Sequence, residues 1–476
     1  MRVAFYTLGC KLNQSESEAL ASSFKSRGFF VGRHDEDADI FIVNTCTVTS
    51  KAEQKARRII RHLARGNPEA LIIITGCYAQ LDAPFLQTLA PNVLVFGHDR
   101  KYQLLELAEC IEKTGVPDND LQLQNSARDC ISGFLDRPAD THGIFRFDAD
   151  TYSFHSRAFL KIQDGCDHQC AYCRVRLARG KSVSLSPDEV IARAEHLAAS
   201  GYREIVLTGV NITAYQAPGD SHFRLPRLLE YITSRPGTFR VRLSSLEPEM
   251  ITREFISAAA HPRICPHFHI PVQSGSDRIL KAVYRPYTAD KLRSAVRELR
   301  RIKEDPFLAA DVIVGLPGET DEDFEATRSL IEELEFAALH VFPFSPRPGT
   351  ELYHSKHHVP ERIAGERSSV LRDMADRLHE VYASRWIGRE LEILPEEPKI
   401  INGEKFWSGW SENYLRVEFS LKGLDLRSGV RPVEKAGLAG TDLSAADQGV
   451  RGSLVRVLLT GMEDDRLVGT IRQTEL

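Results

Sequence analysis

Apolar runs and amphipathic stretches alternate along the first part of the chain. Residues 3–8, 39–43 and 70–75 are apolar runs of strand length, and the last of them contains Leu-Ile-Ile-Ile. Apolar positions recur at helical spacing over residues 15–25 and 51–64. Alternation of this kind favours a parallel sheet, and a nearly continuous apolar run is typical of a strand that is covered on both faces.

The alternation resumes after residue 157 and lasts longer. Six apolar runs predict strands at 158–163, 204–208, 239–243, 267–272, 309–314 and 339–343. Ser186 and Thr320 each precede a helical pattern as a capping residue, and Pro187 stands at the first position of the first of these helices. Six strand–helix units suit a partial (β/α)6 barrel, short of the eight units of a closed barrel.

After about residue 386 the pattern changes to short strands separated by turn residues. The expected strands are 391–394, 414–420, 453–459 and 467–471, which together suit a small β-barrel interrupted by a polar insertion at 423–449. The sequence therefore predicts an α/β protein with a parallel α/β domain, a polar linker region, a central partial barrel and a C-terminal β-barrel. These segments span residues 1–115, 116–153, 154–384 and 385–476.

The composition is that of a globular protein with a sizeable core, at 42% hydrophobic and 27% charged residues. The formal net charge is −5, so any contact with a nucleic acid must come from a local basic face. No apolar run approaches the ~18 residues of a membrane span, and the N-terminus has no basic segment followed by an apolar one. We therefore expect a cytoplasmic protein that makes no membrane contact.

The nine cysteines are the first sign of chemistry, because clustered cysteines in a reducing compartment indicate metal ligands before disulfides. Each of the first three predicted strands runs directly into a cysteine, namely Cys10, Cys46 or Cys77. Parallel strands end at one edge of their sheet, so these three cysteines are expected to converge in space. Three further cysteines are expected to be buried or incidental thiols: Cys110, Cys130 and Cys265.

The sharpest motif is a CxxxCxxC that directly follows the first strand of the predicted barrel and contains Cys166, Cys170 and Cys173. A cubane iron–sulfur cluster usually takes four thiolates. Three thiolates leave one iron open to a small chelating molecule. A zinc site made by these cysteines and His168 is the alternative, but the strand before the motif and the strand–helix units after it favour the cluster.

This motif at the functional face of a barrel resembles that of the radical S-adenosylmethionine (SAM) enzymes. In that superfamily the open iron binds the amino and carboxylate groups of SAM, and an electron from the cluster cleaves the sulfonium to give a 5′-deoxyadenosyl radical. The segments around the other three cysteines closely resemble the N-terminal domain of the methylthiotransferases: Thr7-Leu8-Gly9-Cys10-Lys11-Leu12-Asn13-Gln14, Val43-Asn44-Thr45-Cys46-Thr47-Val48 and Thr75-Gly76-Cys77-Tyr78-Ala79. Members of that family carry there a second three-cysteine cluster, whose open iron holds the sulfur that is methylated and inserted.

Within this family, residues 9–14 look most like the branch that acts on N6-threonylcarbamoyladenosine next to the anticodon of tRNA. Residues 207–211 and 409–414 also suit that branch. Residues 409–414 resemble part of a TRAM domain, an RNA-binding β-barrel that resembles the OB-fold in how it is used. The chain departs from the family after the CxxxCxxC, where a hydrophobic pair and a proline are usual. It has instead Arg174-Val175-Arg176-Leu177-Ala178-Arg179-Gly180.

The resemblance implies a transferase that uses two [4Fe–4S] clusters and two molecules of SAM. Its substrate would be C2 of N6-threonylcarbamoyladenosine at position 37 of the tRNA anticodon loop, with an electron donor such as flavodoxin or ferredoxin. We expect a monomer. An aryl C–H bond is too strong for ordinary acid–base catalysis, so the six cysteines serve as ligands and no side chain needs to act as a general base.

Three alternatives stay open at this point. Two of them share the cluster layout and differ in the substrate, which would be isopentenyladenosine in tRNA or an aspartate of a ribosomal protein. The third is a non-catalytic RNA-binding protein with structural zinc.

Several polar residues follow the predicted barrel strands, where they could contact the ribose, carboxylate or adenine of SAM. The candidates are Asn211, Ser244, Glu247, Gln273 and Asp311. Capping of turns and helices is the alternative role for such residues.

Two sets of residues could contact RNA. The first is a row of basic residues on one helix, which is either a solvated face or a contact for phosphates: Lys55, Arg57, Arg58, Arg61 and Arg65. The second is a group of aromatic residues that either stack on bases or fill the barrel core: Phe406, Trp407, Trp410 and Tyr414.

Overall fold

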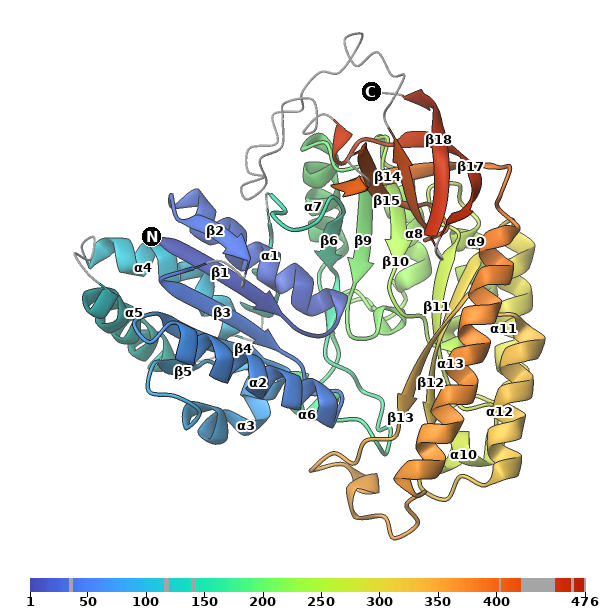
Figure 1. Cartoon of the computed structure of the whole chain (residues 1–476), viewed down its shortest axis with the longest axis horizontal. Helices are drawn as coiled ribbons and strands as arrows, with labels where there is room; N and C mark the ends of the chain where they lie inside the picture. The colour runs from blue at the N-terminus through green and yellow to red at the C-terminus, as the bar shows by residue number, and fades with distance from the viewer. Residues whose placement is uncertain are drawn as a thin grey trace.

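The computed structural model describes residues 1–33, 37–114, 120–137, 140, 143–149, 151–401, 404–420, 450–463 and 466–474. The predicted insertion at 423–449 lies outside these residues. Figure 1 shows the N-terminal α/β domain in blue beside the central strands, with the C-terminal barrel in red above them. The α/β class and the order of the three domains confirm the prediction from the sequence.

The N-terminal domain is built on a five-stranded parallel sheet in the order β2-β1-β3-β4-β5. Its strands are β1 (Arg2–Thr7), β2 (Phe30–Arg33), β3 (Ile40–Thr45), β4 (Leu71–Gly76) and β5 (Val93–Val95). Every residue of β3 and β4 is buried, as expected for apolar runs in a sheet covered on both faces. The sequence predicted β1, β3 and β4 but not the shorter β2 and β5.

Helices cover both faces of this sheet. Leu20 and Phe24 of the first helix pack into one apolar cluster, whereas Ile59 and Ile60 of the second pack into another. The helical elements of this domain are α1 (Lys11–Ser26), α2 (Ser50–Gly66), α3 (Cys77–Gln87), the 3-10 segment η1 (His98–Glu106) and α4 (Leu107–Lys113).

The segment 116–153, which the sequence predicts as a linker region, holds a helix instead. Helix α5 spans Asp120–Leu135. Its Ala127, Ile131 and Phe134 are buried in the main apolar cluster, and their spacing of four and three places them on one face. A disulfide between Cys110 and Cys130 joins α4 to α5, which corrects the expectation of two separate thiols. Cys265 is a buried thiol, as expected.

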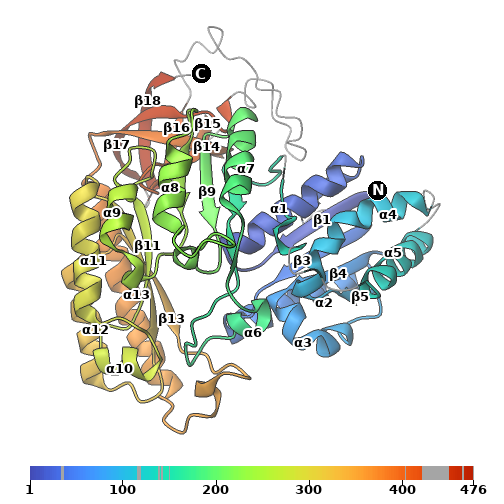
Figure 2. The same cartoon turned by 180° about the vertical axis from the view of Figure 1, so that it is seen from behind.

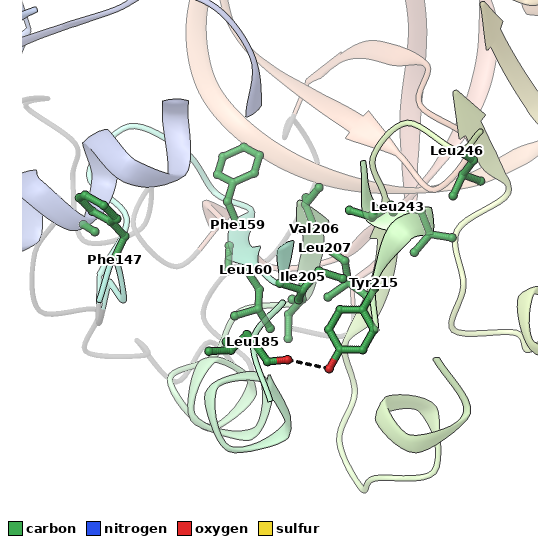
Figure 3. Close-up of a cluster of buried hydrophobic side chains, with 14 of the residues drawn as sticks. Phe147, Phe159, Leu160, Leu185, Ile205, Val206, Leu207, Tyr215, Leu243 and Leu246 are labelled. Atoms are coloured by element: carbon green, nitrogen blue, oxygen red, sulfur yellow. Dashed lines mark hydrogen bonds between the residues drawn. The ribbon is translucent and has the colours of Figure 1, made fainter. Parts of the chain in front are cut away.

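The central domain has six parallel strands in the order β6-β9-β10 and β11-β12-β13, and a single parallel bridge from Val241 to Ile264 links the two halves. The strands are β6 (Ala158–Lys161), β9 (Glu204–Thr208), β10 (Arg240–Leu243), β11 (His267–Gln273), β12 (Phe307–Val314) and β13 (Ala338–Pro343). All six predicted strands are present. Figure 3 shows part of the apolar core between β6, β9 and β10, where the Tyr215 hydroxyl donates to the Leu185 carbonyl at 2.8 Å.

Helices follow the barrel strands, and two of their starts are those predicted. The Ser186 hydroxyl accepts from the Glu189 amide, and Thr320 forms a reciprocal capping box with Asp323. A two-stranded pair, β7 (Gln163–Asp164) and β8 (Val183–Ser184), flanks the first loop. The helices are α6 (Val175–Arg179), α7 (Pro187–Ala199), α8 (Leu225–Thr233), α9 (Arg253–Ala259), α10 (Asp277–Ala282), α11 (Ala289–Ile302), α12 (Asp321–Leu334) and α13 (Glu361–Ser384).

A partial barrel has an open side between its first and last strands, and the N-terminal domain spans the two edges of this side. Next to β6, Glu16 of α1 pairs with Lys161 at 3.0 Å. Beyond β13, Glu53 of α2 pairs with Arg347. Both views place α6 of the central domain beside the N-terminal domain (Figures 1 and 2). The carboxyl edge of the N-terminal sheet is thereby brought to the barrel.

The C-terminal domain is a closed barrel of five strands in the order β14-β15-β16-β18-β17 among the residues described. Its strands are β14 (Glu390–Ile401), β15 (Glu404–Ser411), β16 (Arg416–Ser420), β17 (Val455–Glu463) and β18 (Arg466–Thr474). Trp407 of β15 is fully buried in its core. This confirms the predicted small β-barrel, although β15 itself was not predicted.

Glu204, at the start of β9, anchors the C-terminal barrel to the central domain. Its carboxylate accepts from Arg240 at 2.7 Å and from Arg242 at 2.6 Å. The same two guanidinium groups donate to backbone carbonyls of the C-terminal barrel, at Trp410 (3.1 Å) and Ser411 (3.0 Å). One buried carboxylate thus fixes two arginines that hold the neighbouring domain.

We expect Glu204→Gln to lower the melting temperature by about 6–12 °C, because removing one partner of a buried ion pair costs about 3 kcal/mol. Differential scanning calorimetry measures this shift. Glu325→Gln is the matched control, since Glu325 pairs with Arg328 on an exposed face of α12 and is expected to change the melting temperature little. Equal melting temperatures for Glu204→Gln and the wild type would contradict the anchoring role.

Candidate active site

A cavity of about 720 Å³ lies where the three domains meet. Pockets of about 300–1,000 Å³ are typical of small-molecule sites, so this one is large enough for a nucleoside. The N-terminal domain supplies its three strand-end cysteines to the wall, and the barrel and the C-terminal domain supply Ser244, His269 and Tyr414, among others.

The three N-terminal cysteines converge as the parallel sheet predicts. Cys10 is the N-cap of α1 after β1, Cys46 directly follows β3, and Cys77 is the first residue of α3 after β4. These three strands are neighbours in the sheet. We call Cys10, Cys46 and Cys77 the N-terminal trio.

Two glycines make room for the N-terminal trio. Gly9 and Gly76 have φ of +104° and +97°, which a side chain rarely tolerates. A Cβ on Gly9 would lie 2.8 Å from the Cβ of Cys46, and one on Gly76 would lie 2.4 Å from the carbonyl oxygen of Thr45. The backbone could not bring the cysteines together with any larger residue at these positions.

Arg179 of α6 connects the N-terminal trio to the central domain. Its Nε donates to Cys77 Sγ at 3.2 Å. Its Nη1 lies 3.1 Å from Glu16 and 3.0 Å from Asp164, and all of these groups are buried. Asp164 stands two residues before Cys166, so one side chain bridges the two cysteine-bearing loops.

Two lysines complete this buried charge cluster. Lys101 approaches Glu16 at 2.5 Å, and Lys161 approaches Glu16 at 3.0 Å and Asp164 at 2.5 Å. Burial alone would raise the pKa of both carboxyl groups, but Arg179 and the lysines hold the pKa of each well below its usual value. With Arg179, these five side chains carry one more positive than negative charge beside the N-terminal trio.

The chemistry of the N-terminal thiols fits a metal cluster. Burial raises the pKa of Cys46 to about 12 and raises the pKa of Cys77, although Arg179 partly opposes the second shift. Thiols bind metals as thiolates, and a metal supplies the positive charge that lets buried thiols ionise. Arg179 adds an N–H donor to one of the sulfurs, which is a second-sphere contact typical of cluster sites.

The central trio, Cys166, Cys170 and Cys173, lies in the loop between β7 and α6. Cys173 Sγ accepts from the backbone amide of Val175 at 3.4 Å. Cys170 Sγ accepts from Nη1 of Arg285 at 3.3 Å. Burial raises the pKa of Cys173 to about 12, so this thiol, too, needs a nearby positive charge to ionise.

Neither trio is arranged as a closed zinc site. A tetrahedral zinc site with Zn–S bonds of about 2.3 Å places its sulfurs about 3.8 Å apart. In the described part of the chain, three groups bring their ligand atoms within 4.8 Å of one another, and neither trio is among them, with or without His168. His168, the fourth ligand of the alternative zinc site, groups instead with Glu247 and Glu249.

Two protein-family models match separate parts of the chain. Residues 2–97 match the model of the Uncharacterized protein family UPF0004, and residues 160–331 match that of the Radical SAM superfamily. A threonylcarbamoyladenosine tRNA methylthiotransferase MtaB of Treponema pallidum is 41% identical over 443 residues, covering 83% of this chain and 91% of that protein. The protein of the same name from Bacillus subtilis is 36% identical, covering 88% of this chain and 90% of that one.

The chain belongs to the radical SAM methylthiotransferase family. As a member, it is an enzyme that transfers sulfur-containing groups, and its cofactors are SAM and [4Fe–4S] clusters. Among solved structures, the radical SAM methyltransferase TsrM of Kitasatospora setae aligns with a TM-score of 0.49 at 16% identity, covering 74% of this chain and 76% of that one. Of the helices described, none has the length and apolarity to cross a membrane.

The five predicted SAM contacts lie at different places in this family member. Ser244 lines the cavity, and its hydroxyl has no hydrogen-bond partner in the described part of the chain. Glu247 pairs with Arg285, the donor to the central trio. Burial raises the pKa of Glu247 to about 7, although Arg285 opposes this.

The other three candidates differ in position: Asp311 lies within β12, Gln273 ends β11, and Asn211 lies just beyond β9. The Asp311 carboxylate accepts from His269 Nε2 at 2.9 Å. Asn211 is buried, and its amide oxygen accepts from Thr213. Gln273 is buried with φ of +62°.

The aromatic and basic residues that could contact RNA also differ in position: some are accessible, and others are held inside the protein. Trp410 and Tyr414 stack with ring centroids 4.6 Å apart and line the cavity, whereas Trp407 fills the barrel core. On α2, Arg57 donates to the Tyr78 hydroxyl at 2.8 Å. The other four residues of the predicted basic row are exposed: Lys55, Arg58, Arg61 and Arg65.

Sequence analysis missed the charged and imidazole side chains of the cavity. His267 and His269 alternate along β11, and His340 lies on β13, so that all three line the cavity. Their period of two within an apolar strand was a usable signal that these side chains share one face. Arg179 and Arg285 gave no such signal, because their partners are far away in the sequence.

Proposed function

We propose that this enzyme adds a methylthio group to C2 of N6-threonylcarbamoyladenosine at position 37 of tRNA, using two [4Fe–4S] clusters and two molecules of SAM. The observation that carries the proposal is that the N-terminal trio and the barrel interior line one nucleoside-sized cavity. A sulfur held at the trio and a base inside the barrel would therefore meet without a large movement. The names of the relatives support tRNA as the substrate.

The two cysteine trios would hold the clusters. Cys10, Cys46 and Cys77 would ligate one cluster, and Cys166, Cys170 and Cys173 the other. When bound, the clusters and SAM supply the sulfur, the methyl group and the radical that removes the C2 hydrogen.

The remaining residues of the site would position the clusters, SAM and the base. Arg179 and Arg285 each donate a hydrogen bond to a cluster thiolate, which stabilises the charged sulfur. Ser244 and Glu247 would contact SAM, and we retain Asn211, Gln273 and Asp311 as candidates. The stacked pair of Trp410 and Tyr414 offers an aromatic face at the cavity wall for a base.

We further propose that the C-terminal barrel and the exposed basic face of α2 bind tRNA. Electrons would come from flavodoxin or ferredoxin, and the enzyme would act as a monomer in the cytoplasm. Contacts from α2 to phosphates would show as tRNA binding that weakens with salt.

Mass spectrometry of tRNA nucleosides tests the proposal in cells that lack this protein and have no redundant enzyme. We expect methylthio-threonylcarbamoyladenosine to disappear and its precursor to accumulate. A plasmid carrying the wild type should restore the product, and Cys170→Ala should not. Unchanged product would reject the substrate, and loss of a methylthio-isopentenyladenosine instead would assign the enzyme to that substrate.

A further inference from the structure

Lys11 is a cation of the cavity wall that has no carboxylate partner among the described residues. It follows Cys10 directly, at the first position of α1, and it lines the cavity. The other lysine and arginines that line the cavity each have a carboxylate partner. Lys399 and Arg466 each lie 3.0 Å from Glu418, Arg416 lies 2.7 Å from Glu397, and Arg179 pairs as described above.

The surroundings of Lys11 are positive and fixed. Its Nζ lies 5.2 Å from the centre of the Tyr414 ring, and the guanidinium groups of Arg157 and Arg242 lie 5.7 and 5.0 Å from the same ring. Each of these arginines forms an ion pair with a carboxylate, Arg157 with Glu396 and Arg242 with Glu204. Lys11 differs from both arginines, because no carboxylate of the described residues is within ion-pairing distance of its Nζ.

Tyr414 is held in place by its own turn. Its φ is +64°, a left-handed conformation that is uncommon outside glycine. The Ser411 hydroxyl accepts from the Leu415 amide at 2.8 Å and donates to Asn413 Oδ1 at 2.5 Å. The wall opposite Lys11 is thus built in advance of any ligand, which is typical of a binding site.

An unpaired ammonium group inside a partly enclosed cavity favours an anionic ligand, because burial strengthens the interaction of opposite charges. The proposed substrate carries such a group, the carboxylate of its threonyl moiety. In adenine, C2 and C6 flank N1, so a substituent on N6 lies near the edge of the base that bears C2. If C2 faces the N-terminal trio, the threonyl group lies on the same side of the base, and Lys11 directly follows Cys10 of that trio.

We infer that Lys11 binds the threonyl carboxylate of the substrate and thereby selects threonylcarbamoyladenosine over adenosines with an uncharged N6 substituent. The inference rests on the proposed function. Lys11 is a specificity residue, and it takes no part in the radical step.

The test measures the binding of two anticodon stem–loop RNAs to the cluster-loaded, oxygen-free protein at one salt concentration. One RNA carries N6-threonylcarbamoyladenosine, and the other carries the same nucleoside with its threonyl carboxylate converted to the methyl ester. The wild type should bind the carboxylate RNA about tenfold to a hundredfold more tightly than the ester. Lys11→Gln should bind the two RNAs equally, and Lys11→Arg should keep part of the preference.

Lys399→Gln is the matched control, because Lys399 lines the same cavity but is paired with Glu418. It should keep the wild-type ratio even if its affinity for both RNAs falls. The iron content of Lys11→Gln must equal that of the wild type, which shows that the neighbouring cluster has formed. The inference is overturned if the wild type binds both RNAs equally, or if Lys11→Gln weakens both by the same factor, as a phosphate contact would.

Failure here is separable from failure of the proposed function. If the substrate assignment is right and the inference wrong, cells still make methylthio-threonylcarbamoyladenosine and the ratio of the two affinities does not depend on Lys11. If the substrate assignment is wrong, the nucleoside analysis shows it without any binding measurement.

Discussion

Replacing Cys77 with alanine is expected to abolish methylthio transfer while the cleavage of SAM continues. The variant loses one of three thiolates of the N-terminal trio and leaves Arg179 without the sulfur to which it donates. The central trio lies in another domain and keeps all three of its cysteines. We therefore expect the iron content to fall from about eight to about four per chain, the methylthio product to fall below detection, and 5′-deoxyadenosine still to form.

Cys265→Ala is the control for this variant, because Cys265 is a buried thiol outside both trios. It should retain about eight irons and the methylthio product. Iron analysis and chromatography of the reaction products give both readouts from one preparation. Methylthio product from Cys77→Ala at the wild-type rate would contradict the role of the N-terminal trio.

Replacing Glu16 with glutamine is expected to destabilise the contact between the N-terminal and central domains by about 3–5 kcal/mol. Its fully buried carboxylate lies within 3.1 Å of Lys101, Lys161 and Arg179. An amide cannot balance these charges, which leaves three buried cations facing Asp164 alone. Thermal unfolding and limited proteolysis between the domains measure the effect.

A second substitution shows whether charge is the cause. Adding Lys101→Met to Glu16→Gln removes one of the cations left unbalanced, so the double variant should be more stable than Glu16→Gln alone. Glu109→Gln, in an exposed pair with Lys113, should have almost no effect. A double variant less stable than Glu16→Gln would mean that packing, and not charge, explains the loss.

Most strands of the two α/β domains could be predicted because each is an apolar run bounded by turn residues, whereas the short β2, β5, β7 and β8 were missed. The linker prediction failed at α5, where polar residues fill the exposed face and hide the apolar positions at Ala127, Ile131 and Phe134. Strand β15 was missed because glycine and serine interrupt its aromatic residues. Both errors come from weak local patterns that packing against neighbours completes.

The site was predictable to the extent that it depends on topology. Parallel strands carried the N-terminal cysteines to one edge, so their convergence followed from the order of the elements. The partners of Arg179 and the unpaired state of Lys11 did not follow, since both depend on which side chains from distant segments meet. Glu16 and Arg179 are 163 residues apart in the sequence, and no local pattern links them.

We propose above all that each trio holds a cluster with one iron free of protein ligands. Mössbauer spectroscopy of the anaerobically reconstituted protein, with and without SAM, tests it most directly. The account predicts about eight cluster irons per chain and a change at one iron of the central cluster when SAM is added. A central cluster with four protein ligands and no response to SAM, or one zinc ion per trio, would contradict it.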